Sequence, residues 1–258
     1  MTATTIRARR PGFNAWLRLT QAEARMVIRD TAGLIVPLGL PLLILVMQAV
    51  SIEDTAMEVT PGATVLDVYV LPVVLTMVVA TIAVINMPSF LATYRKTKML
   101  RRLAVTPASP SMVLVAQFVV SLVQVIIGIG LAFAVGTIFF EANLPSNLIA
   151  ALLVLAGCCA AMYAVGMIVA SVAPTPNSSV ALGLMAFFAM AAVGGMFGGI
   201  QNLPEALSTV GVWLPFGASV EAFQSVWLGE AVDWQNWVSL AVTTVVGASV
   251  AAILFRWE

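Results

Sequence analysis

The chain has 258 residues, of which 61% are hydrophobic and only 9% are charged, and its twelve Lys and Arg balance its twelve Asp and Glu. Soluble domains carry about 25% charged residues, so this composition excludes a soluble globular protein and indicates a protein of the membrane. The chain has no histidine and only two cysteines, which are adjacent, so Cys/His metal clusters, a Cys/His nucleophile and a Ser/His/Asp triad are excluded.

The first 32 residues are basic and contain an amphipathic pattern. No apolar stretch with a signal-peptide cleavage site directly follows the basic residues 4–10, so we interpret them as a retained cytoplasmic end. In residues 13–29, apolar side chains recur at spacings of three and four, with Arg18, Arg25 and Arg29 largely on the opposite side. This pattern predicts a helix in the membrane interface, which either anchors the topology or transmits motion from a cytoplasmic partner.

Six stretches lack Lys and Arg and are long enough to cross a membrane, which takes about 20 helical residues. Each stretch is apolar throughout, whereas strands of a membrane barrel alternate in polarity and have only about 10 residues, so helices are predicted. Pro37, Pro41, Pro72 and Pro88 fall in the first two stretches and are expected to kink those helices. The six stretches are residues 33–50, 68–90, 113–140, 148–172, 180–200 and 237–255.

The Lys and Arg residues mark one side of the membrane. Six arginines precede the first stretch, five basic residues lie between the second and third, and Arg256 follows the sixth. The loops on the other side carry acidic residues and no basic residue. Because Lys and Arg accumulate on the cytoplasmic side, we predict that both termini and the loop between the second and third stretches lie in the cytoplasm.

Residues 201–236, between the fifth and sixth stretches, are too many for a tight turn and are still rich in apolar side chains. This composition predicts a re-entrant or interfacial helical hairpin on the outer side, where non-helical backbone at membrane depth must be buried in protein or line a cavity. Just before it, Gly194, Gly195, Gly198 and Gly199 form two overlapping Gly-x-x-x-Gly spacings, which permit close approach of helices.

The six stretches contain no Asp, Glu, Lys, Arg or His, which disfavours a carrier driven by protons or sodium. Asp67 and Glu221 lie near outer ends, and we interpret them as interfacial. No Gly-x-x-x-x-Gly-Lys-Ser/Thr loop occurs, so any ATP must be handled by another subunit, and we assign no catalytic or metal-binding residue. Polar side chains within the stretches either bond between helices, which is the default expectation, or line a path; they include Gln48, Asn86, Gln117 and Gln124.

The loop at residues 94–109 is basic and runs into a Thr-Pro pair. It resembles the cytoplasmic coupling segment of ABC type-2 export permeases, in which a basic Leu-x-Arg-Leu stretch leads to Thr-Pro after the second span. Where members of that family often have an acidic residue and a glycine just upstream, this chain has Arg95 and Lys98. The match runs through Leu100, Arg102, Leu103, Thr106 and Pro107.

Further pieces of the same family pattern follow in order. Pro-Thr-Pro-Asn at 174–177 lies between the fourth and fifth stretches. Gly-Gly-Met-Phe at 194–197 precedes Leu-Pro at 203–204, Trp-Leu-Pro at 213–215 and Leu-Gly at 228–229. Together with the six stretches, these pieces cover most of the chain, which resembles in particular the drug and lipid exporters of the daunorubicin-resistance type.

The resemblance implies an all-α integral membrane protein with six transmembrane helices. Residues 1–32 would be a cytoplasmic N-terminus with an amphipathic connecting helix, and residues 33–258 the transmembrane domain, with a coupling segment at 91–112 and an outer re-entrant segment at 201–236. The chain would lie in the bacterial plasma membrane, contact lipid but no nucleic acid, and pair with a second permease copy or a paralogue. Two cytoplasmic ATPase subunits would bind ATP and Mg, so no cofactor is expected in this chain.

The resemblance also nominates two sets of residues. Arg95, Lys96, Lys98, Leu100, Arg101, Arg102, Leu103, Thr106 and Pro107 form the set expected to couple to the ATPase. In the family, spans two and five face each other across the dimer and bound the substrate path, which here nominates Asn86, Met87, Phe187, Met190 and Phe197.

Three functions remain open at this point. The first is an ATP-driven exporter subunit that moves an amphipathic or lipid-like molecule, such as a drug, outward from the cytoplasm or the inner leaflet. The second is an ion-coupled carrier or a channel, which the missing intramembrane charges disfavour. The third is a membrane scaffold that transports nothing. Co-purification of a nucleotide-binding protein would separate the first function from the other two.

Overall fold

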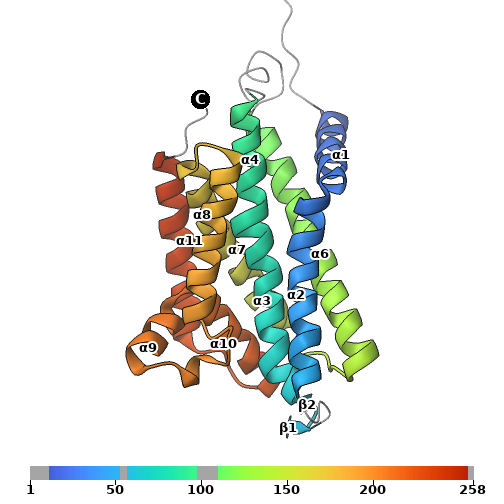
Figure 1. The fold of residues 1–258 in the computed structure, drawn as a ribbon, viewed down its shortest axis with the longest axis vertical. Coiled ribbons are helices and arrows are strands. Elements are labelled where there is room, and N and C mark those ends of the chain that lie inside the picture. The colour runs from blue at the N-terminus through green and yellow to red at the C-terminus, as the bar shows by residue number, and fades with distance from the viewer. Residues whose placement is uncertain (1–11, 53–56, 98–109, 255–258) are drawn as a thin grey trace, which may run out of the picture.

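The structure, a computed structural model, describes residues 12–52, 57–97 and 110–254, and its helices form an upright bundle (Figure 1). Among these residues, six helical segments are long and apolar enough to cross a membrane, in addition to one bent helix pair. The prediction of an all-α membrane protein with six spans is therefore confirmed. The spans are α2 (Thr31–Ser51), the composite second span Leu66–Lys96, α6 (Pro110–Phe140), α7 (Leu148–Val172), α8 (Pro176–Val193) and α11 (Trp234–Leu254).

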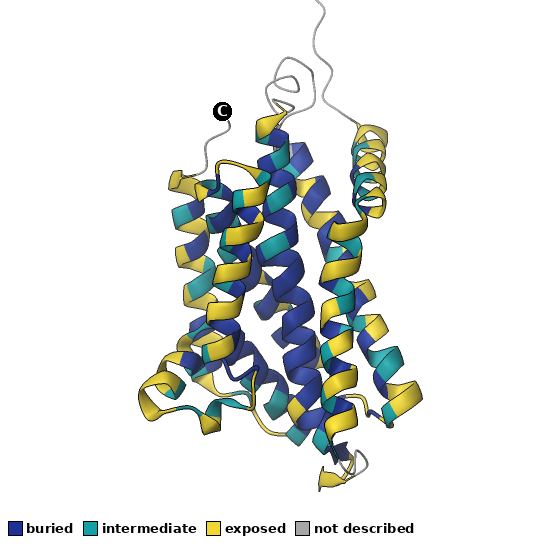
Figure 2. Ribbon diagram, in the orientation of Figure 1, coloured by how far each residue is buried: buried dark blue, intermediate teal, exposed yellow. Residues whose placement is uncertain are grey.

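The second span forms the centre of the bundle. Almost all of its residues are buried within the protein, whereas each of the other five spans leaves most of its residues unburied (Figure 2). A helix that is apolar on all sides is suited to this central place, and the outer helices can turn their apolar faces to lipid. The span has four consecutive segments: η1 (Leu66–Val70), α3 (Leu71–Ala80), η2 (Thr81–Asn86) and α4 (Met87–Lys96).

Two of the four prolines that were expected to kink helices follow π-helical turns. Pro72 comes after η1 and Pro88 after η2, each in the first turn of the next α-helix. A proline has no N–H to donate and its ring collides with the preceding turn of an α-helix, and the wider π turn makes room for that ring. Pro37 and Pro41 lie inside α2, which continues through both.

The two ends of the bundle differ in charge. One end, which we call the basic end, holds α1 (Phe13–Arg29) and the end of α4, and the other, the acidic end, holds the strands and a bent helix pair (Figure 1). This separation follows the predicted topology, although the cytoplasmic position of the basic end stays a prediction. All the described Lys and Arg lie at the basic end: Arg18, Arg25, Arg29, Arg95 and Lys96.

The acidic end carries a short hairpin that the sequence did not predict, in which β1 (Glu58–Thr60) pairs antiparallel with β2 (Ala63–Thr64). It also carries α9 (Glu205–Trp213) and α10 (Pro215–Leu228), which meet at an angle of 83° and follow the short 3₁₀ turn η3 (Ile200–Asn202). Helices within residues 201–236 were therefore predicted correctly. Their re-entry into the membrane stays a prediction.

The fifth span ends earlier than the sequence predicted, because α8 stops at Val193. Three of the glycines that follow, Gly195, Gly198 and Gly199, have φ angles of +84°, +130° and +87°. Side chains with a Cβ atom rarely adopt such angles, whereas glycine does so at little cost. These three glycines build the turn that leads from α8 to η3. Gly194, the first of the four, lies in close contact with Gly217 of α10, so close approach of helices is found there.

Candidate functional site

Arg95, at the basic end of α4, binds the end of a neighbouring span. Its guanidinium donates hydrogen bonds to the carbonyl oxygens of Ala170 and Ala173, the latter at 2.8 Å. The last carbonyls of a helix lack donors within the helix and carry the negative end of the helix dipole. Arg95 therefore caps the end of α7 and ties it to the second span, while Lys96 beside it is exposed.

The other predicted ATPase-coupling residues lie outside the described residues, so their role stays a prediction. Described structure does reach both sides of this segment, because α4 ends at Lys96 and α6 begins at Pro110. A partner bound to the segment would therefore act directly on the second and third spans. The residues concerned are Lys98, Leu100, Arg101, Arg102, Leu103, Thr106 and Pro107.

A buried contact joins α1 to the same end of the second span. The hydroxyl of Tyr94 donates a hydrogen bond to the carboxylate of Glu23, and both side chains are buried. Burial raises the pKa of Glu23 above its ordinary value, and the hydrogen bond from Tyr94 offsets only part of that rise. The sequence did not predict this pair, because nothing in the amphipathic pattern distinguishes Glu23 from the other polar residues of the helix.

The five nominated path residues do not share one surface in the single chain. Asn86, Met87, Phe187 and Met190 are buried in the bundle, where α8 packs against η2 and α4. Phe187 packs edge to face on an aromatic ring of α10, whereas Phe197, in the turn after α8, is 72% exposed. Spans two and five are thus neighbours within one chain, and a path between two chains stays a prediction.

The side-chain amide of Asn86 is hydrogen-bonded to the backbone of α2. Pro37 has no N–H for the carbonyl oxygen of Gly33, four residues before it. Asn86 donates a hydrogen bond to that oxygen at 2.8 Å, and Gln124 of α6 donates another at 3.0 Å. Asn86 also donates to the side-chain oxygen of Gln124 at 3.1 Å. Three spans therefore meet at one carbonyl, and the predicted bonding of Asn86 and Gln124 between helices is confirmed.

The π-helical segment η2 is held on two sides. The hydroxyl of Thr81 donates at 3.2 Å to the carbonyl oxygen of Pro37, which Pro41 leaves without a helical donor. Gly166 of α7 and Gly183 of α8 lie so close to the carbonyls of η2 that a Cβ atom on either glycine would collide with them. These contacts fix η2 between α2, α7 and α8.

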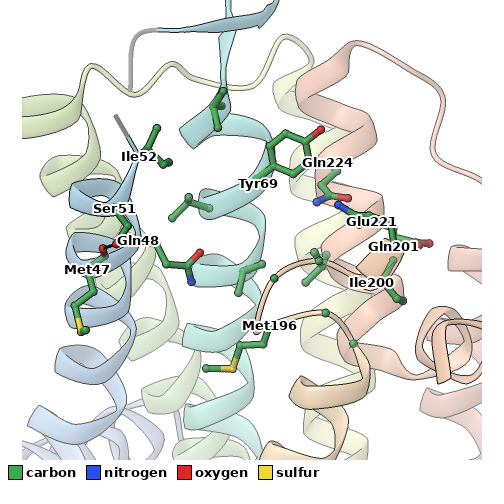
Figure 3. Close-up of a pocket in the computed structure, with 18 residues that line it drawn as sticks. Met47, Gln48, Ser51, Ile52, Tyr69, Met196, Ile200, Gln201, Glu221 and Gln224 are labelled. Carbon is green, nitrogen blue, oxygen red and sulfur yellow. Dashed lines mark hydrogen bonds between the residues drawn. The ribbon is translucent and has the colours of Figure 1, made fainter. Parts of the chain in front are cut away.

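An open pocket of about 480 Å³, which we call the outer pocket, lies at the acidic end (Figure 3). Its walls come from α2, the start of the second span, the glycine turn after α8, and α10. Tyr69, Glu221 and Gln224 lie on one side of it and Gln48 on the other (Figure 3). Apolar walls with a few polar groups are typical of sites for amphipathic small molecules. The chain thus offers a chamber at the end opposite to the predicted ATPase contact.

Asp67, the second residue of η1, is fully buried within the protein, and its position near the membrane interface stays a prediction. Its carboxylate accepts hydrogen bonds from the backbone N–H groups of Thr64 at 2.9 Å and Asn143 at 2.8 Å, and from the amide of Asn143 at 3.0 Å. It therefore ties the hairpin and the loop after α6 to the start of the second span. Glu221, which was interpreted in the same way, is partly buried in the wall of the outer pocket.

Comparison with protein families finds that residues 21–254 match the family described as ABC-2 family transporter protein. The matched range begins within α1 and ends with the last residue of α11, so it includes all six spans, the predicted coupling segment and the bent helix pair. A search of curated proteins finds no match to the chain.

Proposed function

We propose that this chain, which belongs to the ABC-2 transporter family, is the permease subunit of an ATP-binding cassette exporter. It moves an amphipathic or lipid-like compound, such as a drug, outward from the cytoplasm or the inner leaflet. Two separate ATPase subunits bind ATP and Mg at the basic end and drive the transport. A second permease chain, identical or paralogous, completes the complex in the bacterial plasma membrane.

The family match over all six spans is the observation that carries this proposal. The contacts at the basic end support it, because they connect the predicted coupling segment with the bundle. Arg95 binds the end of α7, and Tyr94 binds Glu23 of α1. A displacement of the coupling segment by a closing ATPase pair would therefore reach α1, α7 and the central span together.

The outer pocket supports the direction and the kind of cargo that we propose. It lies at the acidic end of the span whose basic end leads into the coupling segment. Its lining combines apolar side chains such as Met47 and Val73 with polar groups such as Gln48 and Gln224. An amphipathic molecule could leave the membrane interior through such a chamber, since each part of it would find a matching wall.

The proposal is tested by isolating the tagged chain from its native membrane in mild detergent and assaying bound proteins for ATPase activity. We expect a nucleotide-binding ATPase to co-purify and to be lost from the variant Arg101→Glu/Arg102→Glu. The matched variant Arg101→Lys/Arg102→Lys keeps the charge and should retain the ATPase. Purification of the chain without any ATPase would overturn the proposal.

An ion-coupled carrier is the runner-up function, and it makes an opposite prediction. The exporter should move no cargo in ATP-depleted membrane vesicles when only a pH gradient is applied, because the apolar part of the spans offers no ionisable relay. Efflux driven by the gradient alone would contradict the exporter proposal and favour the carrier.

A further inference from the structure

A second hollow lies near the basic end, on the outside of the bundle. Its volume is about 540 Å³, and its lining residues come from α4, α6, α7 and α11. We call it the inner groove. Val115 and Phe118 of α6 and Ala248 and Ala252 of α11 line it and are exposed in the chain. The inner groove therefore opens on a surface of the bundle that would face lipid tails.

Small side chains create this hollow. α7 and α11 pack tightly, and Ala164 of α7 lies against Gly247 of α11. Ala160 of α7 and Ala248 and Ala252 of α11 are among the residues that line the groove, and their small side chains leave space between α6 and α11. The remaining lining is mainly apolar and includes the large side chains Met87, Leu91, Leu114, Phe118 and Met167.

One oxygen atom of a residue that lines the inner groove has no hydrogen-bond partner in the described part of the chain. Gln117 of α6 is only 2% exposed, and its Oε1 atom is buried without a hydrogen bond among the described residues. Gln124, two turns further along the same helix, has its amide bonded to Gly33 and Asn86. Buried acceptors are almost always satisfied, so an orphaned one in the wall of an open groove points to a donor that a ligand supplies.

The depth of Gln117 in the membrane suits the polar end of an amphipath. It lies seven residues after the start of α6, and seven residues of helix rise about 10 Å. α6 has 31 residues and is about 46 Å long at about 1.5 Å per residue, whereas the hydrocarbon core is about 30 Å thick. A centred α6 would therefore place Gln117 close to the boundary between head groups and hydrocarbon.

The chemistry of the lining further limits the class of ligand that fits the groove. None of the lining residues carries a charge at neutral pH. Tyr163, which also lines the groove, already donates its hydroxyl proton to Ser121 at 2.8 Å and can only accept from a ligand. Thr244, the third polar residue of the lining, likewise donates its hydroxyl proton, to the carbonyl oxygen of Leu240 at 2.7 Å. The side-chain oxygens of the groove therefore call for a donor, and the uncharged walls favour a neutral molecule over an ion.

We propose that the inner groove binds the exported molecule as it leaves the inner leaflet, and that this molecule is a neutral amphipath with a hydroxyl or N–H donor. The donor group bonds to Oε1 of Gln117, and the apolar body lies between α6 and α11 over the alanines of α7 and α11. This inference rests on the proposed export function for the origin of the ligand, whereas the binding itself requires no ATPase partner.

Photolabelling of the purified chain in nanodiscs of phosphatidylcholine tests the binding, because that lipid has no hydrogen-bond donor. The probes are a long-chain primary alcohol with a diazirine in its tail and the methyl ether of the same alcohol. We expect the alcohol to label groove residues about fivefold more than the ether, the factor that corresponds to one hydrogen bond. Gln117→Leu should abolish this preference, and Ala248→Phe should reduce labelling by both probes.

Two control variants separate binding from damage to the fold. Ala156→Phe adds the same ring at an exposed position of α7 outside the groove and should label like the wild type. Gln124→Leu removes the bonds to Gly33 and Asn86 and should unfold at a lower temperature while it keeps the preference for the alcohol. Gln117→Leu removes an oxygen that has no hydrogen-bond partner among the described residues, so it should unfold at no lower temperature than the wild type.

Equal labelling by alcohol and ether would overturn the inference and show that the groove holds ordinary lipid tails. A preference that persists in Gln117→Leu would overturn it as well. The origin of the ligand is tested in the assembled transporter, where Ala248→Phe should slow export of a donor-bearing amphipath and Ala156→Phe should not. Alcohol preference in a chain that recruits no ATPase would leave the binding site standing and contradict the export function instead.

Discussion

Glu23 and Asp67 are carboxylates that the bundle buries at opposite ends, and each one joins the second span to a neighbouring element. The carboxylate of Asp67 accepts hydrogen bonds from three N–H donors, which take the place of water and stabilise the buried charge. Glu23 has the hydroxyl of Tyr94, and burial dominates its titration. The two residues therefore predict different experiments.

Substitution of Asp67 by alanine should be strongly destabilising. Two backbone N–H groups, those of Thr64 and Asn143, would lose their acceptor, and we expect a loss of about 3 kcal/mol in the free energy of unfolding. Thermal unfolding in detergent measures this loss. The exposed neighbour Glu58 provides the control, since Glu58→Ala should change stability by less than about 0.5 kcal/mol. A melting temperature of Asp67→Ala equal to that of the wild type would show that these hydrogen bonds do not stabilise the protein.

The Glu23–Tyr94 contact should depend on pH. The folded-state pKa of Glu23 lies above its unfolded value of 4.5, so the folded state binds its proton more tightly than the unfolded state. The stability of the wild type relative to Glu23→Gln should be greatest below pH 4.5 and fall as the pH rises through the raised pKa. Melting temperatures of both proteins from pH 4 to about pH 8 test this expectation. A difference that grows with pH would refute it.

At the scale of elements, the second span combines features that ordinary helix rules disfavour. It contains two π-helical segments and two prolines, and yet it is the most buried span. Neighbouring helices compensate by close contact: glycines of α7 and α8 lie directly on the carbonyls of η2. Backbone of this kind is tolerated within a membrane when protein surrounds it.

Gly183 should not tolerate a methyl group. A Cβ atom there would lie 2.5 Å from the carbonyl oxygen of Val84, which is backbone and cannot rotate away, so Gly183→Ala should cost about 1–3 kcal/mol. Gly130 in α6 is the matched control because a Cβ atom there would have no neighbour within 4 Å. Gly130→Ala should leave the protein unchanged or raise its stability by up to about 1 kcal/mol. Equal melting temperatures for the two variants would contradict the packing argument.

At the scale of the whole molecule, the topology can be tested with single cysteines, since Cys158 and Cys159 are buried. Ala206 of α9 and Thr97 after α4 are both exposed, at the acidic and basic ends respectively. A membrane-impermeant maleimide added to intact cells should label Ala206→Cys, and it should label Thr97→Cys only after the membrane is opened. The reverse pattern would invert the predicted orientation.

The sequence predicted those parts of the molecule that depend on local properties. A continuous apolar run indicates a membrane helix without knowledge of its neighbours, and all six were found, although the glycine turn ended the fifth one early. The inner groove could not be predicted, because its alanines belong to different helices and meet only in the folded bundle. For the same reason nothing in the sequence distinguishes Gln124, whose side-chain oxygen accepts a hydrogen bond, from Gln117, whose side-chain oxygen has no partner among the described residues.

The carbonyl of Gly33, at which α2, the second span and α6 meet, also limits how the protein can change shape. Any sliding or rotation of α2 against its neighbours would break two hydrogen bonds to an oxygen that Pro37 has deprived of its helical donor. Together with the glycine contacts around η2, these bonds hold α2, α6, α7 and α8 to the second span. In the proposed complex of two permease chains, we expect alternating access to come from movement of the chains against each other, with opening and closing at the boundary between them.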